Sequence, residues 1–177
     1  WLEETDAQSW NDIISTAALN RTHFQSRAAL FGRSGADALA ALRALSENEP
    51  HPALMTGEAR ERGQLVYVFP GQGSQWQGMG AALLRESDVF REAIDACDVA
   101  LEALTGWSVT SVLRGDDDAP ALDRVEVIQP ALFAMTLGLS KLWTSLGLAP
   151  SAVVGHSQGE VGAAVVAGAL TLEDAAR

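Results

Sequence analysis

The stretch that decides the fold is SAVVGHSQGEVGAAVVAGAL, residues 151–170. It begins with an apolar run and ends with a long series of small residues. A short apolar run predicts a buried strand over 152–156, and the small residues predict a closely packed helix over 160–170. Polar residues turn the chain between the two elements. Together with a similar unit earlier in the chain, this order is typical of a doubly wound α/β sheet.

The turn in this stretch carries a candidate nucleophile. Gly155, Ser157 and Gly159 fit the pattern G-x-S-x-G, in which a strained turn between strand and helix presents a serine. Glycine is needed on both sides because larger side chains would collide there. The following helix would direct free N–H groups and its positive end toward an oxyanion forming at Ser157. The alternative is an ordinary glycine-rich turn, but the flanking strand and helix favour a nucleophile.

The sequence does not provide a convincing base for this serine. His156 is adjacent, but successive side chains of a strand point to opposite faces. We therefore expect His156 to face away from Ser157, as a buried structural histidine with a hydrogen-bonded ring. His23 and His51 lie in the N-terminal part of the chain. Glu160 is expected to cap or neutralise the start of the helix, a structural role.

A second glycine-rich loop follows an earlier strand. LVYVF, residues 65–69, predicts a strand buried on both faces of a parallel sheet, and PGQGSQ, residues 70–75, comes directly after it. The loop lacks the Lys-Ser/Thr ending of a phosphate-binding loop and the spacing of a dinucleotide fingerprint. Ligands of open α/β sheets bind at the carboxyl ends of strands. We expect this loop to lie beside the serine turn and to supply a backbone N–H to an oxyanion hole; the alternative is a simple turn.

The remaining sequence indicates two domains, 1–63 and 64–177. The first is expected to be a small mixed α/β unit, and a polar segment around residue 63 marks the boundary. Its predicted elements are helices at 11–20 and 34–48, the second capped by Ser34, and strands at 23–32 and 51–57. The second domain is expected to contain helical segments over 81–104, a short helix or turn over 108–115, and a helix over 129–147 with Pro130 in its first turn and Gly147 at its end.

Composition narrows the possible functions. The formal net charge of −11 argues against nucleic-acid binding, which needs clustered Lys and Arg. No signal peptide and no uninterrupted apolar run of membrane-spanning length are found, so we expect a cytoplasmic protein without a membrane partner. Cys97 is the only cysteine and the three histidines are scattered, so we expect no disulfide and no metal site.

Three motifs in order resemble one family. VFPGQGSQWQGMG (68–80), QPALFAMTLGLSKLW (129–143) and GHSQGEVGAAVVAGALTLEDAAR (155–177) are similar to the acyltransferase domain of modular type I polyketide synthases, kin to malonyl-CoA:acyl carrier protein transacylases. THFQSRAALFG (22–32) and its following helix resemble the linker between ketosynthase and acyltransferase. The resemblance implies an α/β-hydrolase-like parallel-sheet core, of which this chain holds the N-terminal part, preceded by the linker domain.

The resemblance also implies a reaction. Ser157 would take an acyl group from acyl-CoA as an ester and pass it to the phosphopantetheine thiol of an acyl carrier protein, with no bound cofactor. The backbone N–H groups of Gln72 and Gln158 would be the oxyanion donors, and Gln129 would line the pocket. The adjacent ketosynthase domain would be a further partner.

Two features of the resemblance concern the substrate. Gln158 after the serine and RVEVIQ at 124–129 are typical of methylmalonyl-selective members, so methylmalonyl-CoA is expected over malonyl-CoA. The catalytic histidine, the carboxylate-binding arginine and a ferredoxin-like subdomain follow later in the family, so we expect a truncated domain that acylates poorly by itself. The alternatives are an α/β-hydrolase esterase or thioesterase, and a non-catalytic linker or docking fragment.

Overall fold

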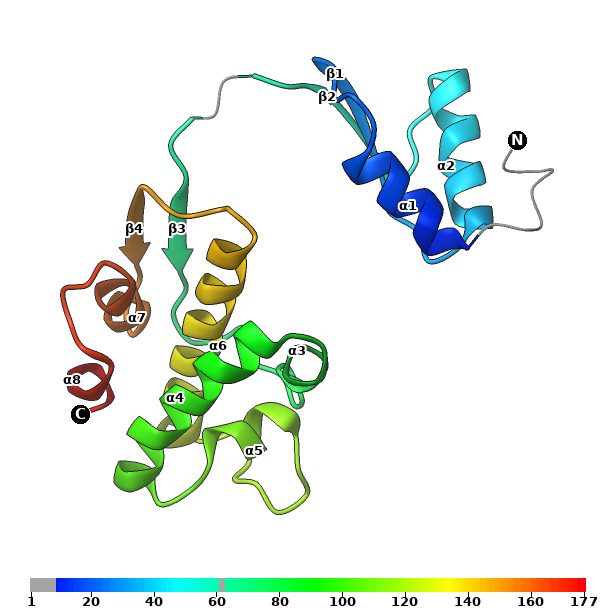
Figure 1. Cartoon of the computed structure of the whole chain (residues 1–177). Helices are drawn as coiled ribbons and strands as arrows, with labels where there is room; N and C mark the ends of the chain where they lie inside the picture. Colours follow the sequence, from blue (N-terminus) through cyan, green and yellow to red (C-terminus); the bar gives the residue numbers. More distant parts are fainter. Residues whose placement is uncertain (1–8, 61–62) are drawn as a thin grey trace. The chain divides into compact units, whose positions relative to one another are not determined.

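A computed structural model of the chain describes residues 9–60 and 63–177. They belong to two compact units, Trp1–Arg62 and Gly63–Arg177, which we describe separately (Figure 1). The division falls next to the boundary predicted near residue 63. Residues 1–8, which entered the argument about a signal peptide, and residues 61–62 of the polar boundary segment lie outside the described residues.

The first unit contains two helices and two strands. In order they are α1 (Trp10–Leu19), β1 (Ser26–Leu30), α2 (Gly35–Glu47) and β2 (Leu54–Glu58). The strands pair antiparallel, with Ala28 opposite Thr56. The predicted cap is confirmed, because Ser34 and Asp37 form a capping box at the start of α2. Three alanines of α2 form the buried residues of this helix: Ala38, Ala41 and Ala44.

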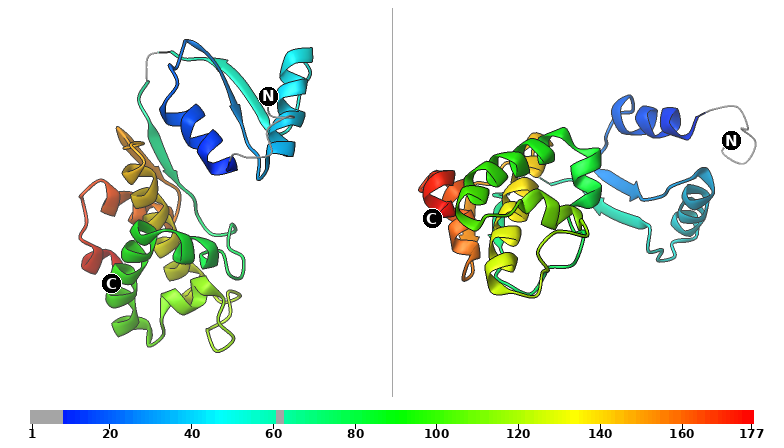
Figure 2. Two further views of the ribbon diagram at one scale, coloured as in Figure 1. Left: turned by 45° about the vertical axis from the view of Figure 1, so that its right-hand side comes forward. Right: turned by 90° about the horizontal axis from the view of Figure 1, so that it is seen from below.

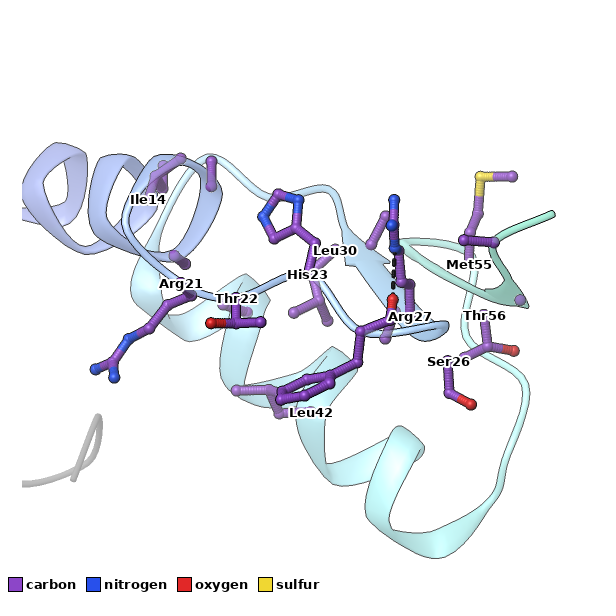
Figure 3. A pocket seen from close by; sticks show the side chains of 18 of the residues that line it. Ile14, Arg21, Thr22, His23, Ser26, Arg27, Leu30, Leu42, Met55 and Thr56 are labelled. Atoms are coloured by element: carbon purple, nitrogen blue, oxygen red, sulfur yellow. Dashed lines mark hydrogen bonds between the residues drawn. The ribbon is translucent and has the colours of Figure 1, made fainter. Parts of the chain in front are cut away.

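The first unit also holds a cavity of about 970 Å³, which Figure 3 shows from close by. Its walls come from both helices and both strands and are mostly apolar. Arg27 lies at this cavity and donates from Nε to the carbonyl of Phe24 at 2.7 Å. This cavity contains none of the predicted site residues.

The second unit is built around a long central helix. Its elements are β3 (Val66–Phe69), α3 (Ala81–Glu86), α4 (Asp88–Thr105), α5 (Val109–Arg114), α6 (Val125–Ser145), β4 (Ala152–Gly155), α7 (Gly159–Val166) and α8 (Leu172–Ala176). Helix α6 packs against α4, α5 and α7 (Figures 1 and 2). The largest fully buried side chains lie on α4, α5 and α6, including Phe90, Ile94 and Leu113.

Strands β3 and β4 pair in parallel, which confirms the α/β class. Phe69 lies opposite Gly155, so both strands end at the same level (Figure 1). Helix α7 packs against both strands, and Phe69 contacts it at Gly162. The expectation that β3 is buried on both faces is wrong for this chain: Val66 and Val68 are 48% and 71% exposed. The uncovered face remains apolar because sheets of this type are normally covered on both sides.

Two predicted helix boundaries need correction, and one helix was not predicted. Helix α6 begins at Val125 rather than 129, so Pro130 lies inside the helix and not in its first turn. Arg124 makes no side-chain capping bond, so the start carries no sequence signal. The helix expected over 160–170 ends at Val166, and Gly168, with φ of +74°, turns the chain into α8, which was not predicted.

One helix meets the length and hydropathy of a membrane span. It is α6, Val125–Ser145, and no other helix of the described residues qualifies. Nine of its residues are buried in the second unit, among them Ala131, Ala134 and Leu137. A helix in the centre of a globular core has the same apolar composition.

Candidate active site

Ser157 lies at the carboxyl end of β4 in a strained conformation. Its φ is +56°, in the left-handed region, and Asn48 is the only other non-glycine residue of the described chain with positive φ. Side chains other than glycine, asparagine and aspartate rarely adopt this conformation, because Cβ approaches the following carbonyl oxygen. The turn closes with two backbone bonds, from Gly159 N–H to His156 O and from Glu160 N–H to Ser157 O, both 3.0 Å. This is the strand, turn and helix context that the serine pattern predicts.

The two flanking glycines are required by close backbone contacts. A Cβ on Gly155 would lie 2.3 Å from Cα of Glu160, and a Cβ on Gly159 would lie 2.3 Å from the carbonyl oxygen of Phe69. Both distances are far below a van der Waals contact, and both involve backbone atoms that have little freedom to shift. The serine turn is therefore packed directly against the end of β3.

The glycine-rich loop after β3 lies beside the serine turn, as predicted. His156 N–H donates to Phe69 O at 3.0 Å, which extends the strand pairing by one residue. A Cβ on Gly71 would lie 2.9 Å from Nδ1 of His156 and 3.4 Å from its carbonyl oxygen. Sequence reasoning missed Gly71, although a glycine directly after the proline that ends an apolar strand is a signal of close backbone approach.

The loop and the turn each contribute a free backbone donor. Neither Gln72 N–H nor Gln158 N–H has a hydrogen-bond partner among the described residues. Gln158 is the N-cap of α7, where the first N–H groups of a helix have no partner inside it. Free N–H groups of this kind are the donors that an oxyanion hole requires.

The other residues chosen from the sequence lie in different environments. Gln129 is exposed on α6 and makes no hydrogen bond with the serine turn. His156 is exposed, so the expectation of a buried structural histidine is wrong. Because β4 ends at Gly155, His156 belongs to the turn rather than to the strand. Glu160 lies in the first turn of α7 without a side-chain capping bond. The side chain of Ser157 has no hydrogen-bond partner among the described residues.

Cys97 is a core residue. Its side chain is 1% exposed on α4, and burial raises the pKa of the thiol to about 12, with a smaller contribution from Asp98. It is therefore a protonated, unreactive thiol at neutral pH. In residues 9–60 and 63–177, no cluster of three His, Cys, Asp or Glu side chains is placed to hold a metal ion.

Comparisons with known proteins agree on one family. The family model described as the acyl transferase domain matches residues 66–177. Polyketide synthase GfsB of Streptomyces halstedii is 50% identical over 166 residues, which are 94% of this chain and 3% of that protein. The spectinabilin polyketide synthase system protein NorA of Streptomyces orinoci is 51% identical over 166 residues, 94% of this chain and 9% of that protein.

Solved structures give the same result. The acyltransferase domain from module 8 of the salinomycin polyketide synthase superposes with a TM-score of 0.85 and 40% identity, covering 99% of this chain and 42% of that one. FabD from Acinetobacter baumannii gives a TM-score of 0.55 and 36% identity, covering 64% of this chain and 34% of that one. The chain thus spans less than half of these solved relatives and under a tenth of the two synthases. By its family match and the geometry around Ser157, the chain belongs to the acyl transferase domain family of polyketide synthases and FabD-like acyltransferases.

Proposed function

We propose that this chain is the serine-bearing part of an acyltransferase that loads a methylmalonyl extender unit onto an acyl carrier protein during polyketide synthesis. The observation that carries the proposal is the backbone at Ser157, held at φ of +56° between two glycines that admit no side chain. A strained serine at the end of a parallel strand presents its hydroxyl to a ligand above the sheet. The finer fold description, an α/β-hydrolase-like core with a ketosynthase-to-acyltransferase linker, forms part of this proposal.

The first half-reaction forms an ester. Ser157 Oγ attacks the thioester carbonyl of acyl-CoA, a bond forms between Oγ and the carbonyl carbon, and the carbon–sulfur bond breaks. The serine proton passes through a general base to the departing CoA thiolate. The family resemblance places this base beyond residue 177, and no described residue hydrogen-bonds the serine side chain.

Two backbone groups would stabilise the negative charge of the tetrahedral intermediate. Gln72 N–H and Gln158 N–H are free and belong to loops that follow paired strands. Donors fixed in advance need no reorganisation when charge develops, and one such donor contributes about 3–4 kcal/mol to lowering the barrier. In the second half-reaction the phosphopantetheine thiol attacks the ester, and its proton returns to Ser157 as the acyl group leaves.

The proposed choice of acyl group rests on Gln158, next to Ser157 in the sequence, and on the RVEVIQ segment at 124–129. Gln158 follows the serine directly, and Gln129 ends the RVEVIQ segment, which forms the first turns of α6. Both residues match the pattern that the family resemblance associates with methylmalonyl-CoA. The side-chain amides of Gln158 and Gln129 would contact the acyl group or its carboxylate. The adjacent ketosynthase would later receive the extender unit from the carrier protein.

Acyl loading of the synthase that contains this chain tests the proposal. With radiolabelled methylmalonyl-CoA, we expect label on the protein, lost in Ser157→Ala and retained in Ser145→Ala, an exposed serine at the end of α6. With equal malonyl-CoA in competition, methylmalonyl should dominate, and Gln158→Leu should shift the ratio toward malonyl. Label that persists in Ser157→Ala would contradict the proposal that Ser157 is the nucleophile. A preference of the parent protein for malonyl-CoA would contradict only the proposed substrate.

A further inference from the structure

A pocket of about 280 Å³ lies between α3, α4 and α5, three helices that follow one another in the chain. One arginine from each helix lines it: Arg85, Arg91 and Arg114. Residues 63–177 contain six Lys and Arg against fourteen Asp and Glu. Half of the positive charges of this strongly acidic unit therefore belong to residues that line one small pocket.

Arg91 makes one backbone hydrogen bond that leaves other donors free. It donates from Nη1 to the carbonyl of Leu84 at 2.8 Å, which links this guanidinium to α3. A guanidinium has five N–H donors, so this bond occupies only part of its capacity. Leu84 also lines the pocket, so the anchored group lies at its wall.

Each arginine also has a carboxylate neighbour on its own stretch of chain. Arg85 pairs with Glu86 at 2.6 Å and Arg114 with Asp116 at 3.1 Å, while Arg91 pairs with Asp88. These partners do not line the pocket. Exposed ion pairs of this type are weak and easily exchanged, so they do not prevent the guanidinium groups from turning to a ligand.

Thr110 of α5 is the second unusual feature of the pocket. Its hydroxyl is buried and has no hydrogen-bond partner among the described residues. Thr110 is also one of the residues that line the pocket. A buried hydroxyl without a partner is costly, and a ligand acceptor would remove that cost.

We propose that this pocket binds a phosphate group. Its lining holds three arginines and one carboxylate, Asp95, so guanidinium groups outnumber carboxylates among the lining residues. Guanidinium groups bind phosphate oxygens in bidentate fashion, and a tetrahedral anion can accept from three directions. The pocket is small enough for one such group with a few waters. This site is separate from the chemistry at Ser157 and does not depend on it.

Titration of the full chain with inorganic phosphate at constant ionic strength tests the site. Side-chain N–H resonances of Arg85, Arg91 and Arg114 should shift and saturate. Arg91→Gln and Arg114→Gln should each weaken binding at least tenfold. Arg124→Gln is the matched control, because Arg124 forms a similar exposed pair with Glu126 outside the pocket; it should bind phosphate like the parent protein.

Further ligands and variants identify the bound group. Thr110→Val should weaken phosphate binding several-fold while the fold, followed by circular dichroism, stays intact. Adenosine 3′,5′-bisphosphate binding at least tenfold tighter than phosphate would assign the site to a nucleotide phosphate; equal binding would assign it to a free phosphate group. Succinate, a dianion without tetrahedral geometry, should bind at least tenfold more weakly.

Three outcomes would overturn the proposal. Shifts that rise linearly without saturation, or that are equally large at Arg124, would mean general ionic screening. Succinate binding as tightly as phosphate would mean attraction to any dianion. Unchanged phosphate affinity in both Arg91→Gln and Arg114→Gln would place the anion elsewhere. None of these readouts uses acyl transfer, so failure here is distinguishable from failure of the serine chemistry.

Discussion

Gly159 at the start of α7 lies against the carbonyl oxygen of Phe69 at the end of β3, so closely that a methyl group on it would stand 2.3 Å away. The contact joins two segments that are distant in sequence and fixes the serine turn against the glycine-rich loop. Both partners are backbone, so the contact admits no side-chain adjustment. The geometry of the candidate site thus depends on the absence of a side chain at one position.

Replacing Gly159 with alanine is therefore expected to destabilise the second unit and abolish acyl loading. Overpacking of this kind costs about 1–3 kcal/mol in the free energy of unfolding, measurable by urea denaturation. Gly63→Ala is the matched control, because a Cβ there meets nothing within 4 Å. Equal stability and equal acyl loading of the Gly159→Ala and Gly63→Ala proteins would contradict the packing argument.

Replacing Ser157 with glycine is expected to increase stability while removing the proposed nucleophile. Relief of the left-handed backbone strain contributes about 1 kcal/mol, partly offset by the larger entropy of glycine in the unfolded chain. Asn48→Gly, at φ of +57°, is the control; asparagine tolerates this conformation, so its gain should be smaller. A Ser157→Gly protein less stable than the parent would show that the turn is not strained.

Replacing Thr110 with valine is expected to stabilise the protein by about 1 kcal/mol. The change removes a buried hydroxyl that has no partner and keeps the shape of the side chain. Thr110→Ser keeps the hydroxyl and loses a methyl group, so it should be less stable than the parent. If the Thr110→Val protein unfolds at a lower temperature than the parent protein, the hydroxyl of Thr110 has a hydrogen-bond partner in solution.

Cys97 should make stability fall at high pH. Its pKa is about 12 in the folded protein, above the ordinary value of 9.0 that applies when the chain is unfolded. Above pH 9 the unfolded thiol loses its proton while the folded one keeps it, so unfolding becomes easier by about 1.4 kcal/mol per pH unit. Below pH 9 the contribution is constant. The difference in slope between the parent and Cys97→Ala, measured by urea denaturation from pH 8 to 10, isolates this effect; parallel slopes would contradict it.

The uncovered face of the strand pair should promote self-association of the isolated chain. Val66 and Val68 are exposed there, and an apolar groove of about 690 Å³, lined also by Trp76 and Trp143, runs beside β3. Exposed apolar strands pair with other copies. Light scattering should detect oligomers of the parent chain, and Val68→Lys should reduce them. Val99→Lys is the control, because Val99 is a similarly exposed valine on α4, and it should leave the oligomers unchanged. A monomeric parent chain would contradict this prediction.

Sequence reasoning predicted the parts of the site that depend on local patterns. The apolar runs predicted both strands of the second unit, and the glycines around Ser157 predicted the turn between β4 and α7. The place of PGQGSQ beside this turn followed from a general property of parallel strands, that their carboxyl ends meet at one edge of the sheet. Roles for Gln72, Gln129 and Gln158 rest on the family resemblance and stay predictions.

The features that sequence reasoning missed or predicted wrongly are those that tertiary contacts determine. The start of α6 at Val125 lacks a capping side chain, and Pro130 suggested a later beginning. The exposure of His156 depends on where β4 stops, which pairing with β3 determines. The arginines of the phosphate pocket are spread over three helices and follow no short motif, so only the packing of α3, α4 and α5 brings them together.

The parallel pairing of Phe69 with Gly155 also sets the order of events during synthesis. All of α3 to α6 is translated between the two strands, which takes of the order of ten seconds at about 5–20 residues per second. The helical core is able to form in that interval, whereas β3 has no partner until β4 leaves the ribosome. Ser157 follows two residues after Gly155, so its strained turn packs against β3 only after the whole helical segment between the two strands has been synthesised.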